Sequence, residues 1–128
     1  SMSNMFMDAH SFKDGNISNW DVSRITDMER MFCNANEFCG DISNWNVSSV
    51  RNMASMFRET HSFNGNISNW DVSRVTTMER MFCNANEFCG DISNWNVSSV
   101  RNMASMFREA HSFNGNISNW DVSRVTTM

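Results

Sequence analysis

The sequence has no leucine, no proline and no tyrosine, and only five glycines among its 128 residues. Leucine is normally among the commonest residues of a globular domain, so an ordinary leucine-packed core is excluded. No run approaches the roughly 18 consecutive apolar residues of a membrane span, and we therefore expect none. A net charge of −4 lacks the basic excess of a nucleic-acid-binding face, so we expect no nucleic-acid partner.

The chain shows no signal peptide, and Ser1 before Met2 resembles a residue left by a cleaved tag. Its apolar share of 41% is enough for one core, and the length predicts a single domain over residues 1–128. The apolar residues are of unusual types, with 12 methionines, 10 phenylalanines and 5 tryptophans. These residues carry the pattern from which the fold is predicted.

The tryptophans show a repeat of 25 residues, because all five stand at that spacing: Trp20, Trp45, Trp70, Trp95 and Trp120. All ten phenylalanines and all but one methionine also keep fixed places in this period. The first repeat is one residue longer, so the repeats are 2–27, 28–52, 53–77, 78–102 and 103–127. Residues 28–77 and 78–127 differ only at Thr60 against Ala110, so the duplicated unit is a pair of repeats.

Apolar spacing within a repeat predicts two kinds of segment. Trp70-Asp-Val72 alternates with period two, which predicts a short strand. Apolar residues over 75–82 are spaced by three and four, which predicts an α- or 3₁₀-helical segment, and Thr76-x-x-Glu79 has the form of a capping box. Stacked repeats at about 4.8 Å would pair their strands in parallel and bury ladders of like side chains.

The sequence Ile-Ser-Asn-Trp-Asp-Val-Ser, followed by Val-Thr-x-Met-x-x-Met-Phe, resembles the BspA-like leucine-rich repeats of bacterial surface proteins and lipoproteins. The resemblance covers residues 2–128. It implies a right-handed β/α solenoid of five coils, each with one short parallel strand and one short helical segment. It also implies an adhesin at the cell surface or secreted, with no catalytic residue to carry over.

The four cysteines form two Cys-x₅-Cys pairs, Cys33 with Cys39 and Cys83 with Cys89. Equivalent cysteines lie two repeats apart, about 10 Å, beyond the ~7 Å Cα limit for a disulfide. Only the pairs within a repeat could close, and reduced thiols and disulfides both stay open. Two thiolates fall short of the four ligands of zinc, so we expect no metal or cofactor. The histidines are interpreted as solvated loop residues: His10, His61 and His111.

Repetition of almost every polar group argues against an enzyme, because an active site needs one unique convergence of groups. Aspartate alternates with asparagine, and arginine with serine, which keeps like charges about 10 Å apart. The outward polar positions are the predicted interaction face, although serine and asparagine could instead form self-bonding ladders. The face comprises Ser18, Asn19, Asp21, Arg24, Ser43, Asn44, Asn46, Ser68, Asn69, Asp71, Arg74, Ser93, Asn94, Asn96, Ser118, Asn119 and Asp121.

Three functions are compatible with this pattern. The first is a surface interaction or adhesion module that binds a protein or glycan through many weak contacts. The second is a structural or engineered repeat scaffold with no ligand of its own. Apolar core positions at both ends, such as Met2 and Met128, predict head-to-tail self-association of such an array. The third is an ice- or crystal-surface binder using the regular Ser/Asn lattice.

Overall fold

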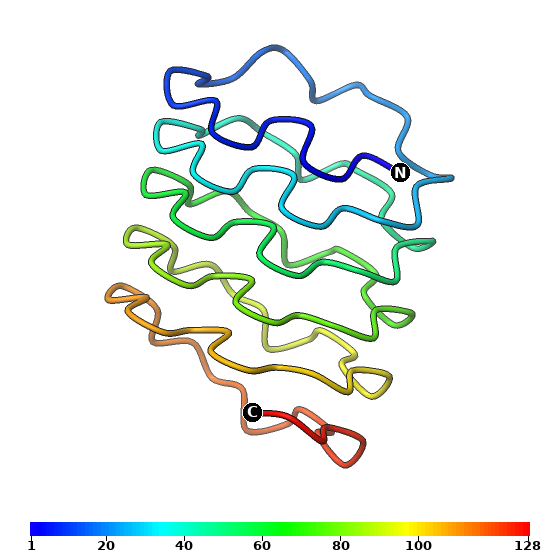
Figure 1. The fold of residues 1–128 in the computed structure, drawn as a ribbon. Coiled ribbons are helices and arrows are strands. Elements are labelled where there is room, and N and C mark those ends of the chain that lie inside the picture. Colours follow the sequence, from blue (N-terminus) through cyan, green and yellow to red (C-terminus); the bar gives the residue numbers. More distant parts are fainter.

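The computed structural model describes the whole chain, from Ser1 to Met128. Figure 1 shows a stack of coils with the two termini at opposite ends of the stack. Backbone hydrogen bonds join residues about one repeat apart, for example from the N–H of Met28 to the carbonyl of Asn52 at 2.9 Å. We number the coils 1 to 5 by the repeats 2–27, 28–52, 53–77, 78–102 and 103–127.

The coils contain no helix and no strand longer than one residue. The regular pairing consists of four isolated parallel bridges that follow one column of the stack: Asp27 with Asn52, Asn52 with Thr77, Thr77 with Asn102, and Asn102 with Thr127. The predicted leucine-rich-repeat solenoid, with a strand and a helical segment in every coil, is therefore wrong. Each coil is built from successive turns instead.

The segment predicted to be helical is a row of turns bonded sideways to the next coil. The Phe32 N–H donates to the carbonyl of Met56 in coil 3 at 3.0 Å, whereas the next N–H, of Cys33, donates back to Arg30 at 3.1 Å. This alternation runs through 28–35 and recurs in the other coils. One N–H group thus donates to the neighbouring coil and the next donates within its own coil, and the hydrogen bonds of a helix are not formed.

These turns place two residues of every coil in the left-handed backbone region. In coil 2 they are Arg30 and Asn34, with φ of 53° and 59°. A turn closed between its first and fourth residues with φ above zero at the third has the form of a type II turn. Buried side chains in this row stand at 28, 31, 32 and 35, which is also the inward spacing of a helix. That coincidence explains why the sequence predicted a helix.

The segment predicted as a strand also consists of turns. The Trp70 N–H donates to Ile67 at 3.2 Å, and the Val75 N–H donates to Val72 at 3.0 Å. No backbone hydrogen bond joins neighbouring coils within this segment. The predicted capping box is absent too, since the Thr76 hydroxyl donates to the Arg51 carbonyl of the preceding coil at 3.2 Å. Pairing between coils therefore lies on the side where a helix was expected.

Phenylalanines form two columns side by side in the core. Rings at equivalent places in successive coils stack with centroids 5.4–6.1 Å apart, and the two rings of one coil lie 4.0–4.3 Å apart. The distance between ring centroids exceeds the ~4.8 Å separation of paired strands, as offset stacking of the rings allows. The columns are Phe6, Phe32, Phe57, Phe82 and Phe107, and Phe12, Phe38, Phe63, Phe88 and Phe113.

Each tryptophan from coil 2 onward clamps its coil to the preceding one. The Trp70 Nε1–H donates to the carbonyl of Ile42 in coil 2 at 3.1 Å. The Trp70 ring packs on Phe57 of its own coil, with the two ring centroids 6.2 Å apart. Equivalent bonds start from Trp45, Trp95 and Trp120. The tryptophan column is thus held through carbonyls and phenylalanines, and no ring contact joins two tryptophans.

Candidate functional site

Four of the five serines that precede the asparagines of the predicted interaction face are engaged in local turns: Ser43, Ser68, Ser93 and Ser118. Ser43 donates from its N–H and its hydroxyl to Oδ1 of Asp41, at 3.0 and 2.6 Å. Ser68 makes the same pair of bonds to Asn66, at 3.0 and 2.7 Å. An Asx side chain that bonds the backbone two residues on fixes a turn. Ser43, Ser68 and Ser93 therefore hold the backbone and are not free donors for a ligand, whereas Ser118 bonds through its N–H alone.

The asparagines that follow these serines are free. All five are exposed and make no side-chain hydrogen bond to the protein, so the alternative of self-bonding amide ladders does not form: Asn19, Asn44, Asn69, Asn94 and Asn119. No backbone pairing joins the coils in this segment. One unbonded amide per coil therefore projects along the stack as a column of donors and acceptors.

A second column of turns carries the alternating aspartates and asparagines. Asp21 accepts from the N–H and hydroxyl of Ser23 at 3.0 and 2.6 Å, and Asn46 accepts in the same way from Ser48 at 3.1 and 2.6 Å. The bond from the Ser23 hydroxyl, followed by that from its N–H, lowers the pKa of Asp21. Aspartate and asparagine thus build the same turn, and only aspartate adds charge.

Acid is expected to destabilise the protein through these turns. Serine bonds lower the pKa of five aspartates below the ordinary 3.8: Asp21, Asp41, Asp71, Asp91 and Asp121. A carboxylate with a lowered folded-state pKa contributes stability that is complete above its unfolded pKa and is lost as pH falls through the folded value. The urea midpoint should therefore drop below about pH 3.8.

The chain supplies the control for this acid effect, because asparagine already builds the same turns in alternate coils. A variant with all five aspartates replaced by asparagine should fold and lose less of its urea midpoint between pH 5 and pH 2. An equal loss in both proteins would show that other carboxylates carry the acid sensitivity.

The nine arginines divide into two classes. Four form ion pairs with the adjacent glutamate, at 3.1–3.8 Å: Arg30, Arg58, Arg80 and Arg108. The other five are exposed and make neither an ion pair nor a side-chain hydrogen bond: Arg24, Arg51, Arg74, Arg101 and Arg124. The second class is available to a ligand.

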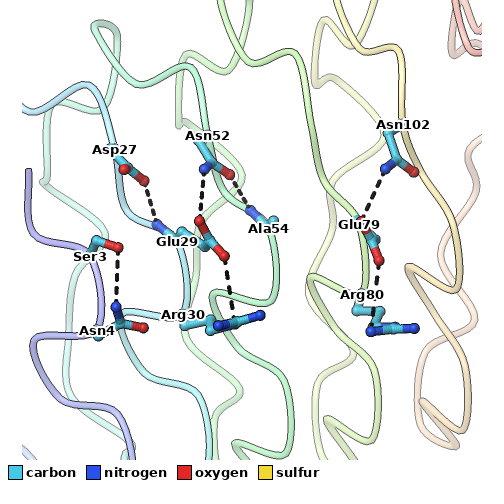
Figure 2. A network of polar contacts seen from close by, with 10 residues as sticks. All are labelled: Ser3, Asn4, Asp27, Glu29, Arg30, Asn52, Ala54, Glu79, Arg80 and Asn102. Carbon is cyan, nitrogen blue, oxygen red and sulfur yellow. Dashed lines mark hydrogen bonds and ion pairs between the residues drawn. The ribbon is translucent and has the colours of Figure 1, made fainter.

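Two of the paired arginines, Arg30 and Arg80, belong to a polar network that links the start and the end of one coil (Figure 2). Asn52, the last residue of coil 2, donates from Nδ2 to Oε2 of Glu29 near the start of the same coil at 3.3 Å, and Glu29 also pairs with Arg30 at 3.6 Å. Two coils further on, Asn102, Glu79 and Arg80 repeat the arrangement. The polar groups on this part of the surface contact one another, so their role is structural.

The unpaired arginines meet in a polar groove of about 310 Å³. It contains no apolar residue and no acid, and it is lined by Arg51, Ser73, Arg74, Thr76, Ser99, Arg101 and Arg124. Arg24 and Arg74 belong to the interaction face predicted from the sequence, whereas Arg124, Arg51 and Arg101 do not, and the last two stand in a column of their own. Their signal was the alternation of arginine with threonine at positions 26, 51, 76, 101 and 126. The groove is the most strongly charged candidate site on the molecule.

A second hollow, of about 460 Å³, opens at the end of coil 5. It is lined by Ser118 and by seven apolar residues whose equivalents in coils 2 to 4 are buried: Met103, Met106, Phe107, Ile117, Trp120, Val122 and Met128. Val122 is 38% exposed and Met128 is 77% exposed. This face presents the core pattern to the outside.

The cysteines are free and fall into two environments. Cys33 and Cys83 are buried, whereas Cys39 and Cys89 are exposed. Burial raises the pKa of the Cys33 thiol. No bridge closes within either Cys-x₅-Cys pair. Thiolate reactivity follows exposure and pKa, so the two members of each pair should react differently.

Alkylation of the folded protein without reductant is expected to modify Cys39 and Cys89 first. Cys33 and Cys83 should react only after urea unfolding, because both thiols are buried, and burial also raises the pKa of Cys33. Peptide mass spectrometry at successive times would read all four sites. Protection of all four in the native and the unfolded protein would instead show two disulfides.

The remaining titratable groups do not gather into a site. His10 Nδ1 lies 2.8 Å from Asn36 Oδ1, an exposed contact between coils 1 and 2. No group of three or more histidine, cysteine, aspartate or glutamate residues is arranged to hold a metal ion. The chain also has no helix with the length and apolarity needed to cross a membrane.

Comparison with known proteins corrects the family expected from the sequence. The matching family model is described as "Mycoplasma protein of unknown function, DUF285", and it matches residues 1–99 and 65–128. No curated protein and no solved structure matches the chain. The expected membership of the BspA-like leucine-rich repeats is therefore wrong. The two matched segments together cover the chain, which belongs to this Mycoplasma family of unknown function, DUF285.

Proposed function

We propose that the protein is a non-enzymatic interaction module that binds a protein or glycan through the polar face of its stacked coils. The observation that carries the proposal is the column of exposed, unbonded asparagine amides, one per coil, from Asn19 to Asn119. An amide offers both donors and an acceptor. A row of such groups at regular intervals suits a ligand that repeats its own hydrogen-bonding groups.

Affinity in this arrangement comes from addition along the stack. Each exposed amide contributes little alone, because water competes for the same bonds. Contacts from several coils to one ligand act together, so binding strengthens with the number of coils engaged. Acting on an extended protein or glycan, the module would work at the cell surface or outside the cell, and that location is part of the proposal.

The proposal is tested by removing the amides without touching the turns. The variant Asn44→Ala/Asn69→Ala/Asn94→Ala keeps the serine bonds that fix the backbone. The wild-type chain would be screened on immobilised neutral glycans and on matrix proteins, and the variant should lose the ligands found in that screen. Glu37→Ala/Glu87→Ala, at exposed positions away from this column, is the control. Ligands that bind both variants equally well would contradict the proposal.

A second candidate function is head-to-tail assembly with another copy of the chain. The apolar hollow on coil 5 faces one way along the stack, and Met5 and Trp20 of coil 1 are exposed at the other end. A second copy placed on coil 5 would continue the same columns, and such a heterologous contact propagates. Static light scattering over a concentration series should show growing mass, which Ile117→Asp/Val122→Asp should abolish. A constant monomer mass at all concentrations would contradict assembly.

A further inference from the structure

We infer that the arginine groove binds the anionic groups of an acidic polysaccharide. The inference rests on the proposed function, since it names a ligand class for the same module, but it uses different side chains. The groove and the asparagine column can therefore be tested separately.

The stack places one unpaired arginine in every coil. Coils 1, 3 and 5 supply Arg24, Arg74 and Arg124, and coils 2 and 4 supply Arg51 and Arg101 from a neighbouring column. Because parallel bridges join successive coils, the coils follow one another at about the spacing of paired strands, and one guanidinium recurs about every 5 Å along the axis of the stack. Four of the five line the groove together. Regular spacing of this kind matches a linear polymer that carries charge on its repeating units.

Backbone bonds between coils hold the arginine stems in register. The Arg51 N–H donates to the Thr26 carbonyl at 2.8 Å, and the Arg101 N–H donates to the Thr76 carbonyl at 2.8 Å. The Thr76 hydroxyl in turn contacts the Arg51 carbonyl at 3.2 Å. The backbone beneath the groove is therefore fixed before a ligand arrives, which reduces the entropy lost on binding.

The groove keeps positive charge although the whole chain is acidic. Asp71, the acid three residues before Arg74, has its pKa lowered mainly by the bonds from Ser73, whose N–H donates to Oδ1 at 3.0 Å, and least by Arg74. No acid lines the groove itself, and Arg51 and Arg101 form no ion pair. Because the whole chain has a net charge of −4, the surface outside the groove repels a polyanion, and the groove is where one would be held.

The lining selects among polyanions. Binding of single-stranded nucleic acid depends on aromatic side chains that stack with bases, and protein interfaces depend on buried aromatic and apolar anchors. The groove has neither, because every lining residue is Arg, Ser or Thr. Guanidinium forks match sulfate and carboxylate oxygens, and the hydroxyl of Ser99 in the same lining suits a sugar hydroxyl. An acidic polysaccharide presents both kinds of group.

The test uses substitutions that the chain already tolerates. Serine holds the place of Arg74 in the adjacent coils, and threonine holds the place of Arg101, so Arg74→Ser/Arg101→Thr should fold. Arg30→Ser/Arg80→Ser removes the same charge outside the groove, at places where coils 3 and 5 have serine. Binding to a heparin decasaccharide, to an oligogalacturonate and to neutral dextran would be measured by calorimetry at several salt concentrations.

We expect the wild-type chain to bind at least one acidic oligosaccharide and not dextran. The groove variant should bind at least tenfold more weakly and with a shallower salt dependence, because fewer counterions are released, while the control stays within twofold. Heparin against oligogalacturonate distinguishes sulfate from carboxylate as the recognised group. Equal losses in both variants, or tighter groove-dependent binding of polyglutamate or oligo(dT), would overturn the inference, as would no binding at all.

The two proposals fail in different ways. Asn44→Ala/Asn69→Ala/Asn94→Ala should leave binding of the acidic oligosaccharide within twofold of wild type, because none of these residues lines the groove. If that variant loses the acidic oligosaccharide and the groove variant does not, the asparagine face stands and the groove inference is overturned.

Discussion

Trp70→Ala is expected to lower the free energy of unfolding by about 3–5 kcal/mol, among the largest effects of any single substitution in this chain. Trp70 is only 4% exposed and lies in the middle coil. Truncation would leave a cavity beside Phe57 and would remove the Nε1–H bond to the Ile42 carbonyl at 3.1 Å. Urea unfolding followed by circular dichroism would measure the loss.

The same substitution at Trp20 is the matched control. Trp20 is 38% exposed and belongs to coil 1, so it has no preceding coil whose carbonyl could accept its indole N–H. Trp20→Ala should lower the free energy of unfolding far less than Trp70→Ala. Trp120→Ala should have an intermediate effect, because the half-buried Trp120 ring still donates to the Ile92 carbonyl. Trp70→Phe would isolate the hydrogen bond, at about 1–3 kcal/mol for the polar group left unpaired. Equal losses at Trp20 and Trp70 would contradict the clamp between coils.

The repeat and the buried positions could be predicted from the sequence. In the middle coils the predicted inward residues are buried, as with Met53, Phe57, Ile67 and Val72. Such positions follow from where apolar residues recur, and burial of apolar surface does not depend on which backbone conformation achieves it. Periodicity at 25 residues therefore carried the prediction of the core.

The backbone between those positions could not be predicted in the same way. Apolar residues at i, i+3, i+4 and i+7 face one side both in a helix and in this row of turns, so periodicity alone cannot separate the two. Residues with positive φ are usually glycine or asparagine, but here the places are also held by Arg30, Ser55 and Glu59. No residue type marked the turns, and the stronger local signal was that of a helix.

The candidate site was predicted in part for a related reason. Outward positions of the predicted strand included the asparagine column and Arg74, and their exposure needs only the alternation of buried and exposed residues. Arg51 and Arg101 were missed because their segment was assigned to a helix start. The groove forms because the turn from Val72 to Val75 brings positions 74 and 76 into the lining of one groove. That juxtaposition depends on backbone geometry.

Substitution of Arg80 separates the turn-built coil from a helical one. Arg80 has φ of 53°, and its N–H donates to the Ala104 carbonyl of the next coil at 2.9 Å. Arg80→Gly should raise the free energy of unfolding by about 0.5–1 kcal/mol, because the left-handed conformation costs an L-residue about 1–2 kcal/mol and glycine nothing. In a helix interior the same change would lower it by about 1 kcal/mol. The sign of the shift in the urea midpoint therefore decides between them.

Two further variants complete the test. Arg74 is exposed and has no positive φ. Arg74→Gly should therefore lower the free energy of unfolding by about 0.5–1 kcal/mol, because glycine gives the unfolded chain more conformational freedom. Arg80→Pro should lower the free energy of unfolding by more than about 3 kcal/mol, because proline fixes φ near −65° and has no N–H to donate to the Ala104 carbonyl. Since Arg30 has the same conformation in coil 2, Arg30→Gly/Arg80→Gly should raise the free energy of unfolding by about twice as much as either change alone. A loss of stability in that double variant would mean that these residues are not held in the left-handed region.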